Sequence, residues 1–330
     1  MSSVPSSLTD KVRSFTLEGE VTLAAFLGAT CVFTAGNGIA TVVEGEPKVV
    51  VLHKGGVLNA VANGTRLVSG GDDGRVVEML ADGTTRTLAE HKGRWIDRVA
   101  LGPDGAIAYS AGKTAHFLPV KGEARALEVA STVGGLAFAP KGTRLAVAHY
   151  GGVTLWFPNA AGAKPEVLGW KGSHLGVAIS PDGRFVVTTM QEAALHGWRI
   201  SDGGHMRMTG YPARVKSFAF TPDGKWLATS GSSEVVLWPF ASKEGPMGKQ
   251  PTMVAPSSTA RVSMVACHPK DPVLAVGYDD GMVLMVRISD GAEILLRAPD
   301  GSPVTAGGWR ADGGAVAFGT AGGGAGVLNF

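Results

Sequence analysis

Short apolar runs, separated by turns rich in Gly, Pro and Asp, follow one another along most of the chain. The stretch FAFTPDGKWLATS at 218–230 is typical, with two apolar runs around a Pro-Asp-Gly turn. Turns of this kind between short runs favour β-hairpins, and no window shows a helical period long enough to compete. The pattern therefore predicts an all-β chain.

The same turn recurs after the same kind of apolar strand. Clear copies end at Gly105 (VALGPDG), Gly142 (LAFAPKG), Gly183 (VAISPDG) and Gly224 (FAFTPDG). Looser copies end at Gly64, Asp271 and Gly313, and the weakest ends at Gly28. Successive copies are 36, 41, 37, 41, 41, 47 and 42 residues apart. A fixed period of this length indicates a repeat architecture.

Each unit holds an apolar first run, two further short runs and a more polar fourth, which predicts four antiparallel strands. Such a sheet buries both faces when units are arranged radially, as in a β-propeller. We expect eight blades, with seven as the alternative, in one domain spanning 1–330 with its repeats at about 20–330. The last unit lacks a fourth strand. We expect residues 11–18 to supply it as an outer strand that closes the ring, preceded by a flexible N-terminus at 1–10.

The repeats resemble the WD-repeat family, with Ser-Pro-Asp-Gly turns, strands such as Leu-Ala-Thr-Ser, Asp-Gly turns and strands that end in Trp156, Trp198 and Trp238. The chain departs from the pattern because it has no Trp-Asp dipeptide. The resemblance implies a partner-binding loop face around a central channel. It also implies a structural hydrogen-bond set, for which His53, Ser69 and Asp73 are the candidates.

Composition narrows the function classes. Hydrophobic residues make up 45% of the chain, which excludes wholesale disorder, and a net charge of +2 gives no nucleic-acid footprint. The 48 glycines follow no collagen period. The two cysteines, Cys31 and Cys267, are far apart, so we expect neither a disulfide framework nor a zinc site. Together with the Ala-, Gly- and Val-rich composition, they predict a bacterial cytoplasmic protein.

One uncharged stretch, 21–43, is long enough to cross a bilayer. It contains Thr, Asn and glycine breaks at Gly28 and at Gly36-Asn37-Gly38, which predict two or three short strands instead. We therefore expect no membrane contact.

The sequence contains no recognisable catalytic motif. Neither a nucleophile elbow nor a metal-ligand motif such as His-x-x-x-His or Cys-x-x-Cys occurs, and the paired carboxylates at Asp72-Asp73 and Asp279-Asp280 belong to hairpin turns. We therefore predict no enzyme activity, no cofactor and no metal. The alternative is a propeller enzyme of the lactonase or hydrolase kind, or a small-ligand binder at the channel mouth, since fold alone does not decide function.

The loops expected on the partner-binding face are largely basic, with aromatic residues among them. Arg, Trp and Tyr dominate interface hot spots, and a basic rim suits an acidic peptide. We therefore predict a scaffold, a monomer or part of a hetero-complex, that binds a protein or acidic peptide. The candidate contacts are Arg94, Trp95, His174, Tyr211, Arg214, Lys216 and Arg261. The longest insertion, 241–259, predicts a mobile loop before a short outer strand, tolerated rather than functional.

Overall fold

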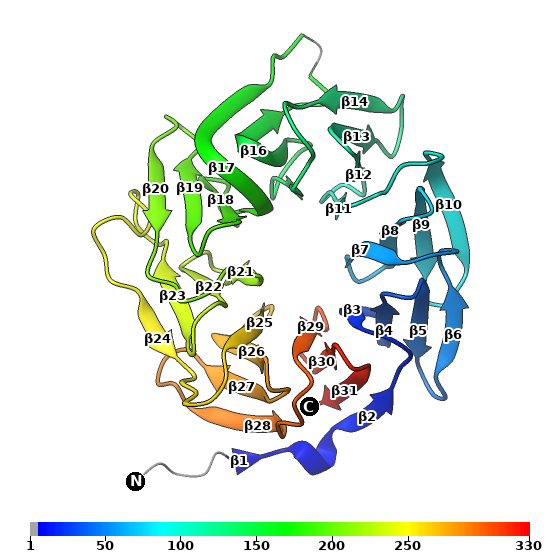
Figure 1. Cartoon of the computed structure of the whole chain (residues 1–330), viewed down its shortest axis with the longest axis vertical. Coiled ribbons are helices and arrows are strands. Elements are labelled where there is room, and N and C mark those ends of the chain that lie inside the picture. The colour runs from blue at the N-terminus through cyan, green and yellow to red at the C-terminus, as the bar shows by residue number, and fades with distance from the viewer. Residues whose placement is uncertain (1–5, 161) are drawn as a thin grey trace. The chain divides into compact units, whose positions relative to one another are not determined.

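The computed structural model describes residues 6–160 and 162–330. Within these residues every element is a β-strand, apart from one 3-10 helix at Thr9–Lys11 (Figure 1). The predicted all-β class is therefore confirmed. The chain divides into two compact units. Unit 1 comprises the described residues up to Val51 together with Ala81–Gly83 and Lys216–Phe330, and unit 2 comprises Leu52–Leu80 and Thr84–Val215.

Unit 1 contains four sheets. The first has β3 (Val21–Leu27), β4 (Thr30–Ala35), β5 (Ile39–Val43) and β6 (Lys48–Val51). The second has β21 (Phe218–Phe220), β22 (Trp226–Thr229), β23 (Val235–Pro239) and β24 (Thr252–Val254). The third has β25 (Val262–Cys267), β26 (Val273–Tyr278), β27 (Val283–Arg287), β28 (Glu293–Arg297) and β1 (Ser6–Ser7). The fourth has β29 (Val304–Trp309), β30 (Ala315–Thr320), β31 (Gly324–Asn329) and β2 (Arg13–Thr16).

Unit 2 contains three sheets. The first has β7 (Val57–Ala62), β8 (Arg66–Gly71), β9 (Arg75–Leu80) and β10 (Thr85–Glu90). The second has β11 (Val99–Leu101), β12 (Ile107–Ala111), β13 (Thr114–Leu118) and β14 (Arg125–Glu128). The third has six strands: β15 (Gly135–Phe138), β16 (Leu145–Trp156), β17 (Glu166–Ile179), β18 (Phe185–Met190), β19 (Leu195–Arg199) and β20 (His205–Met208).

The described residues thus form seven sheets, which agrees with the alternative of seven and corrects the expected eight separate blades. The cause is local to unit 2. The repeats whose turns end at Gly142 and Gly183 share the six-stranded sheet, because the long strand β17 pairs with β16 through its first half and with β18 through its second half.

The N-terminal segment behaves as expected at the last sheet. Strand β2 pairs antiparallel with β31, and Arg13 lies opposite Val327, so the sequence before the first repeat supplies the missing fourth strand. Residues 6–10, which we expected to be flexible, contain β1, which pairs with β28, and the start of the 3-10 helix. Residues 1–5 lie outside the described residues.

The repeated Pro-Asp-Gly turns are closed by hydrogen bonds. In the sixth repeat the amide of Gly224 donates to the carbonyl of Thr221, and the Thr221 hydroxyl donates to Asp223 at 2.7 Å. Gly224 has φ +67°, a conformation that favours glycine because it has no Cβ. The recurring sequence signal thus reflects a real requirement of the backbone.

Hydroxyl side chains at the start of each first strand tie neighbouring sheets of unit 1 together. The first strand is bulged after its first residue in both β25 and β29. The skipped Ser263 donates to the carbonyl of Val304 at 2.7 Å, and the skipped Thr305 donates to the carbonyl of Val21 at 2.7 Å. Bulges often re-aim one side chain in this way.

Glycines in the second strands let those sheets approach each other. A Cβ on Gly277 would overlap the side chain of Val304, and one on Gly319 would overlap that of Val21. Because both valines are buried, the missing methyl groups make room for the core rather than for a flexible backbone.

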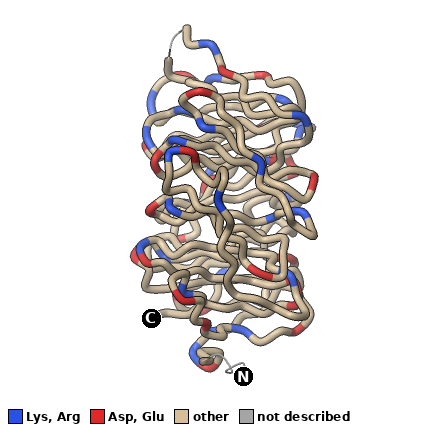
Figure 2. The backbone as a smooth tube through the Cα atoms, turned by 90° about the vertical axis from the view of Figure 1, so that its left-hand side faces the viewer, with Lys and Arg blue, Asp and Glu red and all other residues tan. Residues whose placement is uncertain are grey.

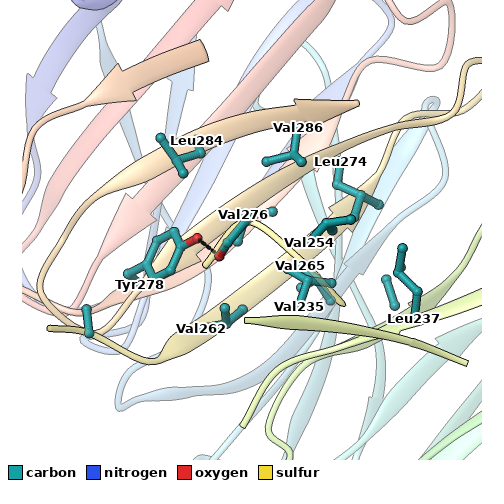
Figure 3. Close-up of a cluster of buried hydrophobic side chains, with 13 residues drawn as sticks. Val235, Leu237, Val254, Val262, Val265, Leu274, Val276, Tyr278, Leu284 and Val286 are labelled. Atoms are coloured by element: carbon teal, nitrogen blue, oxygen red, sulfur yellow. Dashed lines mark hydrogen bonds between the residues drawn. The ribbon is translucent and has the colours of Figure 1, made fainter. Parts of the chain in front are cut away.

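Unit 1 has its largest cluster of buried side chains around β23, β25, β26 and β27 (Figure 3). Valine and leucine dominate this cluster, and Tyr278 is fully buried among them. Its hydroxyl donates to the carbonyl of Ala255 at 2.6 Å, so burying the phenol leaves no polar atom unpaired. This contact also anchors the chain directly after β24.

Two long sequence features have simple outcomes. The apolar stretch 21–43 forms β3, β4 and β5, as predicted, and no helix among the described residues is long and apolar enough to span a membrane. The insertion 241–259 contains turns and then the predicted short outer strand β24, which pairs with β23.

Candidate functional site

The three residues of the predicted structural set of the second repeat lie within hydrogen-bond distance of one another. In unit 2, Nδ1 of His53 is 2.9 Å from Oδ1 of Asp73, and Nε2 is 2.8 Å from the hydroxyl of Ser69. Asp73 also accepts from the guanidinium of Arg75 and from the amide of Lys54. These bonds tie the loop before β7 to the turn between β8 and β9. The set is fully bonded and has a structural role.

Burial and hydrogen bonds together set the pKa values of Asp73 and His53. Burial alone would raise the pKa of Asp73, but hydrogen bonds from Arg75, His53 and the Lys54 amide hold it well below its usual range. Burial lowers the pKa of His53, although Asp73 opposes this shift. His53 is therefore neutral and Asp73 charged near neutral pH.

Five of the seven predicted contact residues are exposed. Unit 2 presents Arg94, Trp95 and Arg214, while unit 1 presents Lys216 and Arg261. Arg214 donates to the side chain of Gln191 at 3.0 Å. Lys and Arg are interspersed with Asp and Glu along the backbone, as Figure 2 shows, so the surface is mixed rather than uniformly basic.

Burial does not fit the predicted contact role of the other two residues. His174 is 1% exposed and Tyr211 is 8% exposed. Nδ1 of His174 is 2.7 Å from the hydroxyl of Thr188, and Nε2 donates to the carbonyl of Trp170 at 3.0 Å. His174 is thus a structural residue that resembles His53, and we withdraw both residues from the predicted contact set.

Trp95 is the most exposed aromatic side chain, at 63%. Its neighbour Ile96 is completely buried beside Gly70, and the Ile96 amide donates to the carbonyl of Gly71 at 3.1 Å. The loop after β10 is therefore pinned by Ile96, and Trp95 is presented to solvent. An exposed indole leaves a large apolar surface in water and so marks a candidate contact.

Tyr150, which we did not predict as a contact, is 62% exposed at a bulge in β16. Its amide donates to the hydroxyl of Ser131 at 2.8 Å, and its carbonyl accepts from Nδ1 of the buried His149 at 2.8 Å. Gly151, at φ +91°, and Gly152 follow directly. The His-Tyr-Gly-Gly sequence was the available signal, because two glycines in mid-strand mark a bulge that re-aims a side chain.

Tyr150 borders two hollows of unit 2. The Arg98 hollow, about 370 Å³, is lined by residues that include Asp97, Arg98, Ser131 and Ser173. The Trp170 hollow, about 270 Å³, is lined by residues that include Trp170, Lys171, Met190, Glu192 and Arg207. Trp95 lies two residues before Asp97. We call the two hollows, together with Tyr150 and Trp95, the Tyr150 surface.

A cluster of histidine and tryptophan rings underlies the Trp170 hollow. His196 is fully buried and stacks on Trp170, with ring centroids 4.1 Å apart. It also packs against Trp198 and His205. Neither ring nitrogen of His196 has a hydrogen-bond partner in the described part of the chain. Burial and the nearby His205, His174 and Arg207 lower the pKa of His196 to about 3, so the ring is neutral.

A second ring cluster lies in the third repeat. Nε2 of His91 is 2.9 Å from the hydroxyl of Tyr109, and His116 stacks on Tyr109 with ring centroids 4.7 Å apart. Burial and the nearby His91 lower the pKa of His116 to about 4. His91 is thus held by the ring cluster of its own repeat.

Several groups that could serve in catalysis are engaged in structural contacts or deeply buried. Turn carboxylates such as Asp182 and Asp223 bond to neighbouring side chains in their own turns. Burial raises the pKa of the Cys267 thiol to about 12, so it is not a ready nucleophile. Among residues 6–160 and 162–330, no three His, Cys, Asp or Glu side chains gather as a metal site would require.

Unit 1 has a larger hollow of about 540 Å³, beside the turn of the sixth repeat. Its lining includes Trp226, Pro272, Ile288 and, from the insertion, Thr252. Lys225 and Asp223 at its edge form an ion pair with each other. The charges of its lining balance, with Lys225 and Lys270 against Asp223 and Asp271, so this hollow is less suited to an acidic partner than the Tyr150 surface.

Three comparisons bear on identity. Residues 204–239 match the family model "WD domain, G-beta repeat". A segment of 111 residues is 29% identical to "Centriole proteome protein 16" from Chlamydomonas reinhardtii, and this segment covers 32% of the chain but 5% of that protein. The crystal structure of the computationally designed Ika8 protein superposes with a TM-score of 0.74 at 19% identity, covering 96% of this chain and 98% of that one.

These comparisons support the fold of the chain but say little about the organism from which it comes. The structural likeness extends over almost the whole chain, but at that identity it speaks for the fold alone. The algal relative is eukaryotic, so it lends no support to the predicted bacterial origin, which stays a prediction.

Proposed function

Because the chain is a WD-repeat β-propeller, we propose that it is a non-catalytic scaffold that binds a protein partner through the Tyr150 surface. WD-repeat propellers are typically interaction scaffolds. We further propose that residues 1–330 form one domain and that the protein works in the cytoplasm, where its two free thiols would stay reduced. The algal relative is named for a protein assembly, which is in keeping with a scaffold role.

The observation that carries the proposal is the pair of exposed aromatic side chains, Trp95 and Tyr150. Each is more than 60% exposed although the backbone beside it is held in place, by buried Ile96 in one case and by Ser131 and His149 in the other. Rigid aromatic side chains lose little conformational entropy on binding and supply much contact area. Tyr150 borders both hollows, and Trp95 stands two residues before Asp97, which lines the Arg98 hollow, so the two side chains are candidates for one partner-binding surface.

Charge supports a protein or peptide partner with acidic groups. Arg94, Arg98, Lys171 and Arg207 belong to or adjoin the Tyr150 surface, and none of them forms an ion pair with a described residue. Asp97 and Glu192 lie among them, so the local balance is four basic against two acidic groups. This modest excess favours an acidic protein segment over nucleic acid, which needs a broad basic patch.

The proposal is tested by affinity co-purification from a native lysate at about 150 mM salt, where exposed charges are screened beyond about 8 Å. We expect wild-type protein to retain a stoichiometric protein partner, and the Trp95→Ala, Tyr150→Ala double variant to lose it. The control is Met247→Ala with Met253→Ala, two methionines about half exposed in unit 1. Equal retention by both variants would overturn the assignment of the surface.

A further inference from the structure

The Arg98 hollow contains an arginine whose charge is not compensated. Nε of Arg98 donates to the carbonyl of Gly134 at 2.6 Å, and Nη1 donates to the carbonyl of Asp97 at 2.7 Å. Nη2 makes no hydrogen bond to a described residue, and no carboxylate of the described chain lies within ion-pair distance of the guanidinium. The two carbonyls fix the group in place and leave one edge free.

The free edge of Arg98 is costly unless it has a ligand. Burial lowers the pKa of Arg98, and the Asp97 charge opposes the shift only in part. A guanidinium nevertheless stays protonated, so the positive charge is retained where water solvates it poorly. Half-buried charges of this kind are usually paired, and a carboxylate can accept two parallel hydrogen bonds from such an edge.

Hydroxyl groups surround the same hollow. The Ser131 hydroxyl accepts from the Tyr150 amide and keeps its own proton available to donate. The hydroxyls of Thr132 and Ser173 line the hollow and make no hydrogen bond to described residues. His174 also lines it, but both ring nitrogens are already bonded. The hollow therefore offers several donors around one fixed cation.

The negative charge of Asp97 determines which kind of anion the Arg98 hollow binds more readily. Its carboxylate lines the hollow and has no hydrogen-bond or ion-pair partner among the described residues. A phosphate close to two negative charges would be repelled more strongly than a carboxylate with one. Asp97 could in turn accept a backbone N–H from a bound chain. At about 370 Å³ the hollow has room for an acidic side chain together with its backbone.

We propose that the Arg98 hollow receives the carboxylate of an Asp or Glu side chain from the bound protein segment, with Arg98 as its anchor. This inference rests on the proposed scaffold function and deepens it. Trp95 and Tyr150 then contact the residues that flank the acidic side chain.

The experiment titrates defined probes into full-length protein and follows backbone amide NMR shifts of residues 97–98 and 131–134. The probes are three hexapeptides, acetylated and amidated, that differ only in a central Glu, Gln or phosphoserine. We expect the Glu peptide to shift these amides saturably, and the Gln peptide to bind at least about tenfold more weakly because it lacks the charge. Tighter binding of phosphoserine, or no binding of the Glu peptide, would overturn the inference.

Variants separate the hollow from the fold. Arg98→Met should abolish the Glu shifts, and Arg98→Lys, which keeps the charge but not the fork, should weaken binding about tenfold. The control is Arg125→Met, an exposed arginine in the outer strand β14. If circular dichroism shows that the Arg98→Met variant is unfolded, binding of the Glu peptide to the Arg98→Lys variant becomes the deciding test. Unchanged Glu binding in a folded Arg98 variant contradicts the inference.

The outcome also separates this inference from the scaffold proposal. If wild-type protein captures a partner and Arg98→Lys captures it equally well, the anchor is wrong and the scaffold stands. If no partner is captured at all, the scaffold proposal fails, while the peptide titration still reports on the hollow alone.

Discussion

Two histidine-containing regions of unit 2 occupy corresponding places in their repeats and differ in how completely they are bonded. Ser69 and Thr188 each follow their turn glycine, Gly64 or Gly183, by five residues, and the hydroxyl of each lies within hydrogen-bond distance of a histidine ring nitrogen. In the second repeat the other ring nitrogen of His53 is hydrogen-bonded to Asp73. In the fifth repeat the other ring nitrogen of His174 is hydrogen-bonded to the carbonyl of Trp170.

The difference extends to the third strand. Ser69 donates to the carbonyl of Val77, and Thr188 donates to the carbonyl of His196, thirteen residues after the turn glycine in both repeats. Val77 is apolar and buried, but His196 brings two unpartnered nitrogens into the same kind of position. Both repeats therefore share a hydroxyl that links a histidine to the third strand. They differ in the third-strand side chain, which determines whether every buried polar atom has a hydrogen-bond partner.

The largest expected loss of stability comes from disrupting the fully hydrogen-bonded set of the second repeat. Asp73→Ala leaves His53, Arg75 and the Lys54 amide without their acceptor, so the free energy of unfolding should fall by about 3 kcal/mol. Urea denaturation measures this. Glu128→Ala, which breaks an exposed pair with Lys113, is the control and should cost under about 1 kcal/mol. Equal losses in the two variants would show that the His53 set is not structural.

The second prediction concerns pH and the unsatisfied region. His196 binds a proton below pH 6.5 when unfolded but only near pH 3 when folded, so protons favour the unfolded chain as the pH falls below 6.5. From this group alone the free energy of unfolding should be about 2 kcal/mol lower at pH 5 than at pH 7. His116 acts in the same direction. The stability that the Asp73 carboxylate contributes does not change between pH 7 and pH 5, because it is lost only as the pH falls below the ordinary pKa of an aspartate.

A smaller effect is expected from making the fifth repeat resemble the second. His196→Leu removes two unpartnered nitrogens but loses the stack on Trp170, so we expect a change within about 1 kcal/mol at pH 7. The same variant should remove only the part of the loss between pH 7 and pH 5 that comes from His196, about 2 kcal/mol. A loss above about 3 kcal/mol at pH 7 would mean that His196 makes essential polar contacts.

The smallest effect on stability is expected at the exposed cations. Charge reversal of Arg214, Lys216 and Arg261 to Glu should change the free energy of unfolding by less than about 1 kcal/mol, because surface charges contribute little. The same variant should weaken capture of an acidic partner. Wild-type capture by the triple variant at moderate salt would contradict a role for these cations in binding.

Much of this could be predicted from the sequence, because recurring offsets carry structural information. The Pro-Asp-Gly turns predicted the strands, and the place of β2 followed from the missing last strand. Both are set by local turn chemistry and by counting. The hydrogen-bonded set of His53, Ser69 and Asp73 was implied by the resemblance to WD repeats.

Other features depend on contacts that the sequence does not display. His174 stands nine residues before its turn glycine, whereas His53 stands eleven before, and His174 lies within strand β17 while His53 lies in the loop before β7. This difference in position disguised its structural role. The shared six-stranded sheet arises because β17 pairs with strands of two successive repeats. Arg98 was missed because only the structure shows that two backbone carbonyls fix its guanidinium, with no ion pair to a carboxylate of the described residues.

Amide hydrogen exchange of the captured complex, compared with the free protein, tests the central claim most directly. The account predicts slower exchange at 94–98, 131–134, 149–152 and 170–174, the segments that form the Tyr150 surface. Protection confined to 221–226, 270–272 and 288–289, around the hollow of unit 1, would contradict it and move the partner to the other hollow.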